Sequence, residues 1–163
     1  MTSTSASSSF PDVPELQGPV PVPTPPLLTD EAAVERVCRL YALAVDTRDG
    51  EMLRSVFAPD AVIRGVLGEM TVTDYLPALE AGVAAYGATQ HNITNQYTVV
   101  EGDRARCWSY CVALHFAAPG NGHDDMAMGV QYRDELERVE GGWRIAGRVT
   151  AQQWVRGPLS QRS

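Results

Sequence analysis

The chain has 163 residues, of which 44% are hydrophobic, and this is enough for one domain with its own core. Its formal net charge is −7 and its basic residues form no cluster, so we expect neither nucleic acid nor an anionic membrane surface as a partner. No apolar run approaches the roughly 20 residues of a membrane-spanning helix. Residues 1–9 lack the basic and apolar parts of a secretory signal, and we therefore expect a cytoplasmic protein.

Residues 1–27 differ in composition from the rest of the chain. A Ser/Thr-rich start is followed by seven prolines between positions 11 and 26, which disfavours a helix and leaves little to bury. We expect a disordered or extended arm here; a polyproline strap along a groove is the alternative. Residues 28–157 are expected to form the folded domain, and residues 158–163 a flexible tail.

The first predicted helix runs from position 29 or 30 to about Thr47. Val34, Val37, Cys38, Tyr41 and Val45 recur every three or four residues, which predicts a buried stripe with Tyr41 pointing inward. Asp46 lies near the C-terminal end, where the helix dipole disfavours an anion. Either Asp46 is a solvated residue at the start of a loop, or it turns into a cavity and holds a histidine.

A second, short helix is predicted over 50–57, with Phe57 on its buried side and Pro59 ending it. A strand over 61–66 follows, and then a helix over 73–86 that has Pro77 within its first turns. From position 89 the period changes to two, which predicts strands over 89–100, 104–117, 126–139 and 143–155. Helices followed by a long meander indicate an α+β fold, in which a curved sheet wraps the helices as a cone with one open end.

Alternation assigns faces to the two first long strands. His91, Ile93, Asn95, Tyr97 and Val99 are predicted to share one face of the first. On the second, one face carries small residues and ends at His115, and the other carries Trp108, Tyr110, Val112, Leu114 and Phe116. Small side chains on a concave sheet leave a void, so His91 and His115 are expected to line one cavity. The bulky face predicts a homodimer interface, or else a contact with the helices.

Each candidate has a structural alternative. The pattern around His91 fits a core histidine that is hydrogen-bonded to the backbone as well as it fits a catalytic base. His115 fits a solvated residue at the end of a strand. Arg148 is predicted to face away from the buried Trp143 and Ile145, unless a bulge near Gly147 resets the register.

Motifs for cofactors and metals are absent from the sequence. No two His or Cys residues have metal-ligand spacing, and there is no phosphate-binding glycine loop or serine nucleophile elbow. We therefore expect no metal and no cofactor. Cys107 and Cys111 would lie roughly 13 Å apart along a strand, too far for a disulfide, and reduced thiols are expected.

Four segments together resemble the SnoaL-like group of the nuclear transport factor 2-like superfamily, whose relatives include scytalone dehydratase and bile-acid 7α-dehydratase. They are Tyr41 with Asp46 and Asp49, the stretch 56–61, the stretch 91–95, and the stretch 142–148. The resemblance covers residues 29–155. It implies the cone-shaped fold, often dimerised through the sheet.

The resemblance also implies roles for individual residues. Tyr41, Asp46 and His91 match the catalytic set of the dehydratases, a second histidine falls at or near His115, and a late arginine matches Arg148. Asp46 would then fix the tautomer of His91, which removes a proton next to a carbonyl while Tyr41 or Arg148 stabilises the enolate oxygen. Residues expected to contact the substrate are Phe57, Asn95, Cys111 and Trp154.

Two related chemistries are disfavoured. Ketosteroid isomerases carry a catalytic Asp on the first strand, where Gly65 stands here, and the second Asp of limonene-epoxide hydrolases is missing. The sequence therefore predicts a cofactor-independent lyase or isomerase for a hydrophobic cyclic metabolite. The alternative is a ligand-binding protein or an oxygenase small subunit with no chemistry of its own.

Overall fold

The computed structural model describes residues 28–66, 68–120 and 122–157; the predicted arm and tail lie outside them. In chain order the elements are α1 (Asp30–Thr47), α2 (Gly50–Ser55), β1 (Phe57–Gly65), β2 (Gly68–Thr71), α3 (Val72–Ala84), β3 (Ala88–Glu101), β4 (Arg104–Phe116), β5 (Met126–Val139) and β6 (Gly142–Arg156). Within the described residues no helix is both long and apolar enough to cross a membrane.

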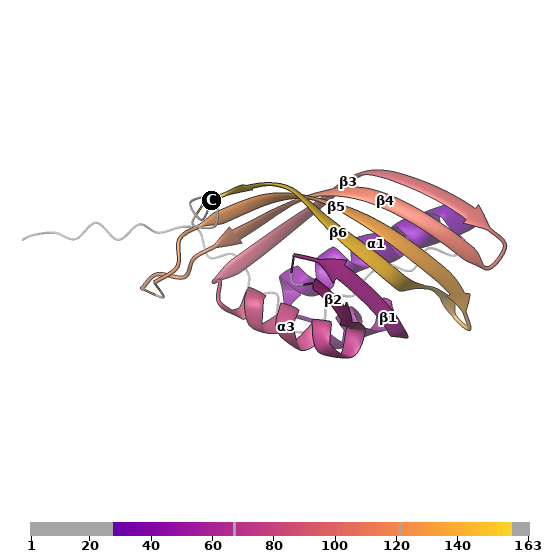
Figure 1. Ribbon diagram of the computed structural model, residues 1–163, viewed down its shortest axis with the longest axis horizontal. Coiled ribbons are helices and arrows are strands. Elements are labelled where there is room, and N and C mark those ends of the chain that lie inside the picture. Colours follow the sequence, from indigo (N-terminus) through magenta and orange to yellow (C-terminus); the bar gives the residue numbers. More distant parts are fainter. Residues whose placement is uncertain (1–27, 67, 121, 158–163) are drawn as a thin grey trace, which may run out of the picture.

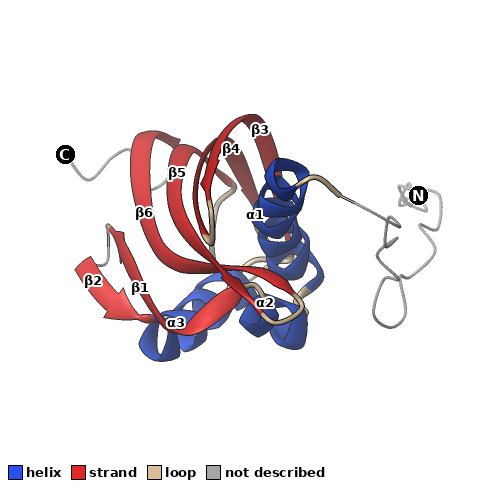
Figure 2. Ribbon diagram, turned by 90° about the vertical axis from the view of Figure 1, so that its right-hand side faces the viewer, coloured by secondary structure: helices blue, strands red, loops and turns tan. Residues whose placement is uncertain are grey.

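The strands form one six-stranded sheet in the order β2-β1-β6-β5-β4-β3. Every neighbouring pair is antiparallel except β1 and β6, which are parallel. The long strands curve over α1, and α3 lies across the open side of the curve near β1 and β2 (Figures 1 and 2). The predicted α+β fold with a curved mixed sheet is confirmed.

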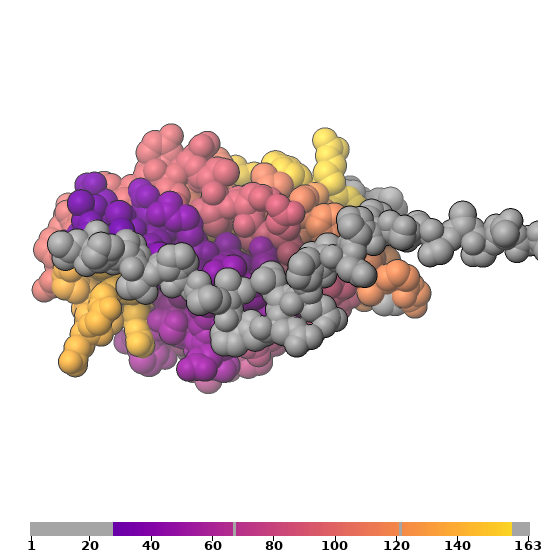
Figure 3. Space-filling model, turned by 180° about the vertical axis from the view of Figure 1, so that it is seen from behind, coloured from indigo at the N-terminus to yellow at the C-terminus, as the bar shows by residue number. Residues whose placement is uncertain are grey.

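Helix α1 is the core helix of the cone. The side chain of Thr29 caps it by accepting a hydrogen bond from the backbone N–H of Ala32, and the predicted apolar stripe is buried, including Tyr41 and Val45. α1 packs along β3, and the two form one continuous surface in Figure 3, α1 in indigo and β3 in pink. This packing brings the end of α1 to the start of β3.

The segment around Pro59 was predicted wrongly. The second helix ends at Ser55, and β1 already begins at Phe57 and runs through Pro59. The pairing of β1 with β6 is interrupted between Phe57 and Val62, so the N–H that proline lacks is not needed for a regular ladder. The short β2 was not predicted, and α3 starts at Val72, one residue before the predicted Thr73.

Strand β4 has the predicted faces. Its small residues are buried on the concave side, and Trp108, Tyr110 and Phe116 are exposed on the convex side. The bulky face therefore does not pack on the helices.

Strand β3 departs from strict alternation. Thr94 pairs with Tyr110 and Tyr97 with Trp108, so β3 has one extra residue at a bulge where Asn95 adopts a left-handed φ of 47°. Tyr97 and Val99 therefore lie on the exposed face, Tyr97 with 68% of its surface accessible, and not beside His91 as predicted. Asn95 is exposed as well.

A second bulge decides the position of Arg148. Leu136 pairs with Ile145 and Glu135 with Gly147, so Ala146 is an extra residue in β6. The bulge turns Arg148 to the same side as Ile145, and both are buried. The register shift considered near Gly147 is therefore present, and Arg148 faces inward.

Candidate functional site

A cavity of about 380 Å³ lies between the concave face of the sheet and α3. Its polar lining includes Tyr41, Tyr75, His91 and His115, and apolar residues such as Met128 provide most of the remaining wall. The described lining contains no Asp, Glu, Lys or Arg. Apart from two imidazoles and several hydroxyl groups, the described wall of the cavity is apolar.

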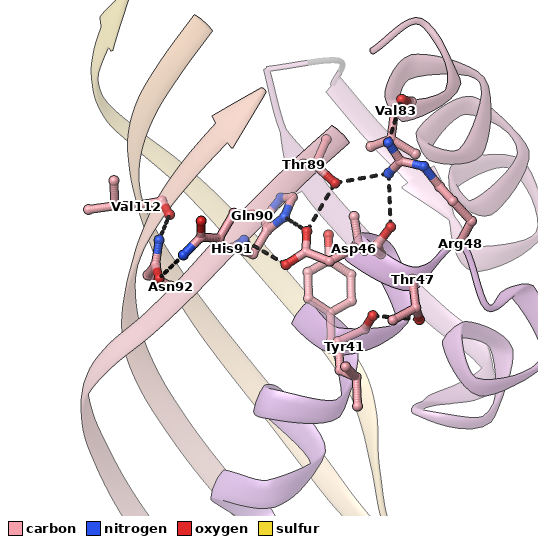
Figure 4. Close-up of polar contacts among 12 residues, drawn as sticks. Tyr41, Asp46, Thr47, Arg48, Val83, Thr89, Gln90, His91, Asn92 and Val112 are labelled. Atoms are coloured by element: carbon pink, nitrogen blue, oxygen red, sulfur yellow. Dashed lines mark hydrogen bonds and ion pairs between the residues drawn. The ribbon is translucent and has the colours of Figure 1, made fainter. Parts of the chain in front are cut away.

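Asp46 and His91 meet at one end of this cavity. Oδ1 of Asp46 lies 2.7 Å from Nδ1 of His91, and the backbone N–H of His91 donates to Oδ2 of Asp46, also at 2.7 Å (Figure 4). Only 5% of the His91 side chain is exposed. Asp46 is therefore not a merely solvated loop residue, and the predicted contact between the two side chains is present.

The hydrogen bonds define the protonation state of the pair. Partial burial raises the pKa of Asp46, but hydrogen bonds from the His91 ring, the His91 backbone and Thr89 outweigh this effect and leave the pKa below its usual value. An ionised carboxylate only accepts hydrogen bonds, so Nδ1 of His91 carries the proton. When the ring is neutral, Nε2 of His91 has the free lone pair that a general base needs.

His115 lies beside His91 in the cavity wall. The two rings meet edge to face at 5.7 Å, and Tyr86 covers His115 from the other side at 4.9 Å. Burial, together with the charges of His91 and Arg48, lowers the pKa of His115 to about 4, so this ring is neutral at pH 7. Its Nδ1 is buried without a hydrogen-bond partner among the described residues.

Two tyrosine hydroxyls face each other across the cavity. The hydroxyl of Tyr41, from α1, lies 2.9 Å from that of Tyr75, from α3. Burial raises the pKa of both phenols, so both remain protonated at neutral pH, and one hydroxyl donates to the other. Tyr75 was missed in the sequence because it falls in the apolar stripe of α3 and has the pattern of an ordinary core residue.

Arg148 lies beneath the cavity and does not line it. Its Nε and Nη2 donate to the two carboxylate oxygens of Asp134 at 2.6 and 2.7 Å, and neither side chain has any exposed surface. The guanidinium is stacked between the rings of Tyr41 and Tyr132, at 4.0 and 4.3 Å. Burial alone would lower the pKa of Arg148, but Asp134 raises it well above the usual value. Arg148 thus contacts the ring of Tyr41 outside the cavity, whereas the resemblance implied that Tyr41 or Arg148 would stabilise the enolate oxygen.

Comparison with known proteins assigns the family. Residues 26–149 match the SnoaL-like domain. The chain belongs to the SnoaL-like family. The recognition made from the sequence is confirmed, although among curated protein sequences none matches this chain significantly.

Solved structures share the fold of this SnoaL-like domain. The Kfla4162 protein from Kribbella flavida is 27% identical, with a TM-score of 0.72 over 78% of this chain and 93% of that one. A scytalone dehydratase-like protein from Novosphingobium aromaticivorans is 23% identical, with a TM-score of 0.69 over 77% and 85%. A hexachlorocyclohexane dehydrochlorinase from Novosphingobium barchaimii is 20% identical, with a TM-score of 0.67 over 78% and 88%. These neighbours show that the fold of this chain is shared over most of its length.

The four residues predicted to contact the substrate do not line the cavity. Phe57 is buried behind it, edge-on to Tyr41 at 5.9 Å, and Cys111 is buried within the concave face of β4. Asn95 is turned outward by the bulge in β3. In β6, Gln153 is an extra residue opposite the step from Gly129 to Val130, and beyond it Trp154 lies exposed over Gly129.

Within 28–66, 68–120 and 122–157, no three His, Cys, Asp or Glu side chains lie close enough together to hold a metal ion. Cys38, Cys107 and Cys111 are buried free thiols. The imidazole and hydroxyl groups that line the cavity can transfer protons and form hydrogen bonds.

Proposed function

We propose that this SnoaL-like protein is a cofactor-independent lyase or isomerase that acts on a hydrophobic, uncharged cyclic metabolite, such as a polyketide, steroid or aromatic intermediate. The observation that carries the proposal is the Asp46–His91 pair at the end of an apolar cavity. A carboxylate that holds Nδ1–H leaves Nε2 of a nearly buried histidine as the base. Nothing else in the cavity wall competes with it, because His115 is held neutral and weakly basic.

The proposed reaction starts with proton abstraction. Nε2 of His91 takes a proton from a carbon next to a carbonyl, and Asp46 stabilises the imidazolium that forms. The electron pair moves to the carbonyl oxygen, where the hydrogen-bonded pair of Tyr41 and Tyr75 supplies a hydroxyl donor. In a dehydration, the enolate then expels a β-hydroxyl, which the imidazolium protonates to water; in an isomerisation, the proton returns to a different carbon.

The cavity supports an uncharged substrate. An anionic or cationic group buried in an apolar wall without a partner is strongly disfavoured, and no lysine, arginine or carboxylate among the described lining residues faces such a group. The volume of about 380 Å³ is within the range of small-molecule sites. We therefore expect neutral ring compounds to bind, and phosphorylated or carboxylated analogues to bind far less tightly.

The alternative is a ligand-binding protein or an oxygenase small subunit that uses the same cavity without chemistry. Deuterium exchange separates the two. Neutral cyclic ketones that raise the melting temperature are incubated with the protein in D₂O, and incorporation at the α-carbon is followed by NMR. Loss of a general base lowers the rate by about 10²–10⁴-fold, so His91→Ala should lose exchange.

The matched control is Asn92→Ala, the next residue on β3, whose amide donates to the carbonyl of Val112 away from the cavity. It should retain the wild-type exchange rate. A His91→Ala protein that is heat-labile but exchanges protons at the wild-type rate would end the proposal. Ligands that stabilise the protein without any exchange would favour the binding protein.

We also propose that the protein is a homodimer through the convex face of the sheet. This face carries exposed Tyr97, Trp108, Tyr110, Phe116 and Trp154, which together form an unusually aromatic surface. Light scattering at micromolar concentration should give twice the chain mass.

A further inference from the structure

Arg48 adopts a backbone conformation that is unfavourable for arginine. It follows the last residue of α1 in a left-handed conformation, with a φ of 59°, where glycine is the usual residue. For a side chain other than glycine or asparagine, this left-handed conformation is sterically unfavourable. The guanidinium makes three hydrogen bonds, to the carbonyls of Val45 and Val83 and to the hydroxyl of Thr89, at 2.9, 3.0 and 2.9 Å.

The chemistry of these groups fixes the direction of each hydrogen bond. Arginine has only donors, so the Thr89 hydroxyl accepts from Nη1 of Arg48. The carboxylate of Asp46 has only acceptors, so the single proton of Thr89 points to Oδ1 of Asp46, 3.0 Å away. That same oxygen also accepts from Nδ1 of His91 (Figure 4). A series of hydrogen bonds, here called the relay, thus runs from Arg48 through Thr89 and Asp46 to His91. The donor and the acceptor of each of these hydrogen bonds are determined.

We propose that Arg48 and Thr89 are positioning residues that hold Oδ1 of Asp46 as an acceptor, while the backbone N–H of His91 occupies Oδ2, and so lock His91 in its Nδ1–H form. This inference deepens the proposed function and rests on it for its catalytic meaning. A proton on Oδ1 of Asp46 would point at the hydrogens that Thr89 and His91 already donate to this oxygen. The relay therefore disfavours protonation of Asp46. The groups that face Asp46 are Arg48 from α1 and Thr89 and His91 from β3, with His115 of β4 beyond.

The relay also reaches the wall of the cavity. Nη2 of Arg48 donates to the carbonyl of Val83 in the last turn of α3, and Val83 itself lines the cavity. One guanidinium therefore ties α3 to the end of α1 and to β3. It sets the separation between the cavity wall and the Asp46–His91 pair.

The test reads the tautomer directly and needs no substrate. The chain has three histidines, so ¹⁵N-labelled imidazoles can be assigned in long-range ¹H–¹⁵N spectra, and the Asp46 carboxyl can be titrated by ¹³C. Wild type should show His91 as the Nδ1–H form. Thr89→Val removes the hydroxyl at nearly constant volume, and should mix the tautomers and raise the Asp46 titration midpoint by about half a pH unit or more.

Two further variants isolate the effect. Thr89→Ser keeps the hydroxyl and should restore the wild-type spectrum. Arg48→Gly relieves the left-handed backbone, so the domain should stay folded while the His91 tautomer is released. An unchanged His91 tautomer and Asp46 midpoint in folded Thr89→Val would overturn the inference. A wild type with the locked tautomer but no exchange on any ketone would instead refute the proposed function and leave the relay standing.

Discussion

The buried ion pair of Asp134 and Arg148 gives the most direct test of how the site is supported. Its partners are 2.6 Å apart with fully buried side chains, and Cys38 also donates a hydrogen bond from Sγ to Asp134 at 3.3 Å. Asp134→Asn leaves the guanidinium buried without a counter-charge. Breaking one half of a buried pair costs about 3–5 kcal/mol, which for a domain of this size lowers the melting temperature by about 6–20 °C.

Removal of both charges should behave differently. A buried pair that is replaced by apolar residues of similar volume is often neutral or stabilising. In Asp134→Leu/Arg148→Met, the lost stacking of the guanidinium on Tyr41 and Tyr132 offsets part of that gain, by about 2 kcal/mol. The double variant should therefore be more stable than Asp134→Asn, although it has lost more polar contacts.

An exposed pair of the same length provides the control. Nε of Arg64 lies 2.6 Å from a carboxylate oxygen of Glu69, but these side chains are 57% and 62% exposed. Glu69→Gln should cost less than about 1 kcal/mol. Urea unfolding followed by tryptophan fluorescence gives each free energy of unfolding and its m-value. Equal losses for Asp134→Asn and Glu69→Gln would refute the argument that burial sets the magnitude.

Three further predictions follow from the site and the sheet. The pKa of His115 is lowered from 6.5 to about 4, so the unfolded chain takes up a proton there first and the free energy of unfolding should fall as pH drops from 6.5 towards 4. In urea titrations across that window, the free energy of unfolding of His115→Phe should fall by roughly 2–3 kcal/mol less than that of the wild type. Parallel pH curves for the two proteins would contradict the assignment. Asp46→Asn should slow α-proton exchange at least tenfold with little change in ligand-induced thermal stabilisation, whereas wild-type exchange would remove Asp46 from the mechanism. If the convex face forms the dimer, Tyr110→Asp should give a folded monomer in light scattering, and a dimer that persists would place the interface elsewhere.

The sequence determined the fold class and the central pair of the site. Apolar residues every three or four positions specified α1 and placed Tyr41 inward, and the change to period two after position 88 specified the meander. The row of small residues on β4 correctly indicated a cavity on the concave side. Asp46 at the end of a helix, where the dipole disfavours it, pointed to a partner, and the resemblance identified that partner as His91. These signals are local or depend on strict periodicity, and they can therefore be recognised from the sequence alone.

The tertiary structure decided the strand bulges and the contacts between distant residues, which periodicity in the sequence does not predict. Single-residue bulges at Asn95, Ala146 and Gln153 reverse the faces of all that follows, so Asn95 and Trp154 leave the site and Arg148 enters the core. A bulge is set by pairing with the neighbouring strand, and no local pattern announces it. The same holds for two polar contacts. Asp134 meets Arg148, 14 residues away, only through the register of β5 with β6, and Thr89 meets Asp46, 43 residues away, only when β3 packs on α1.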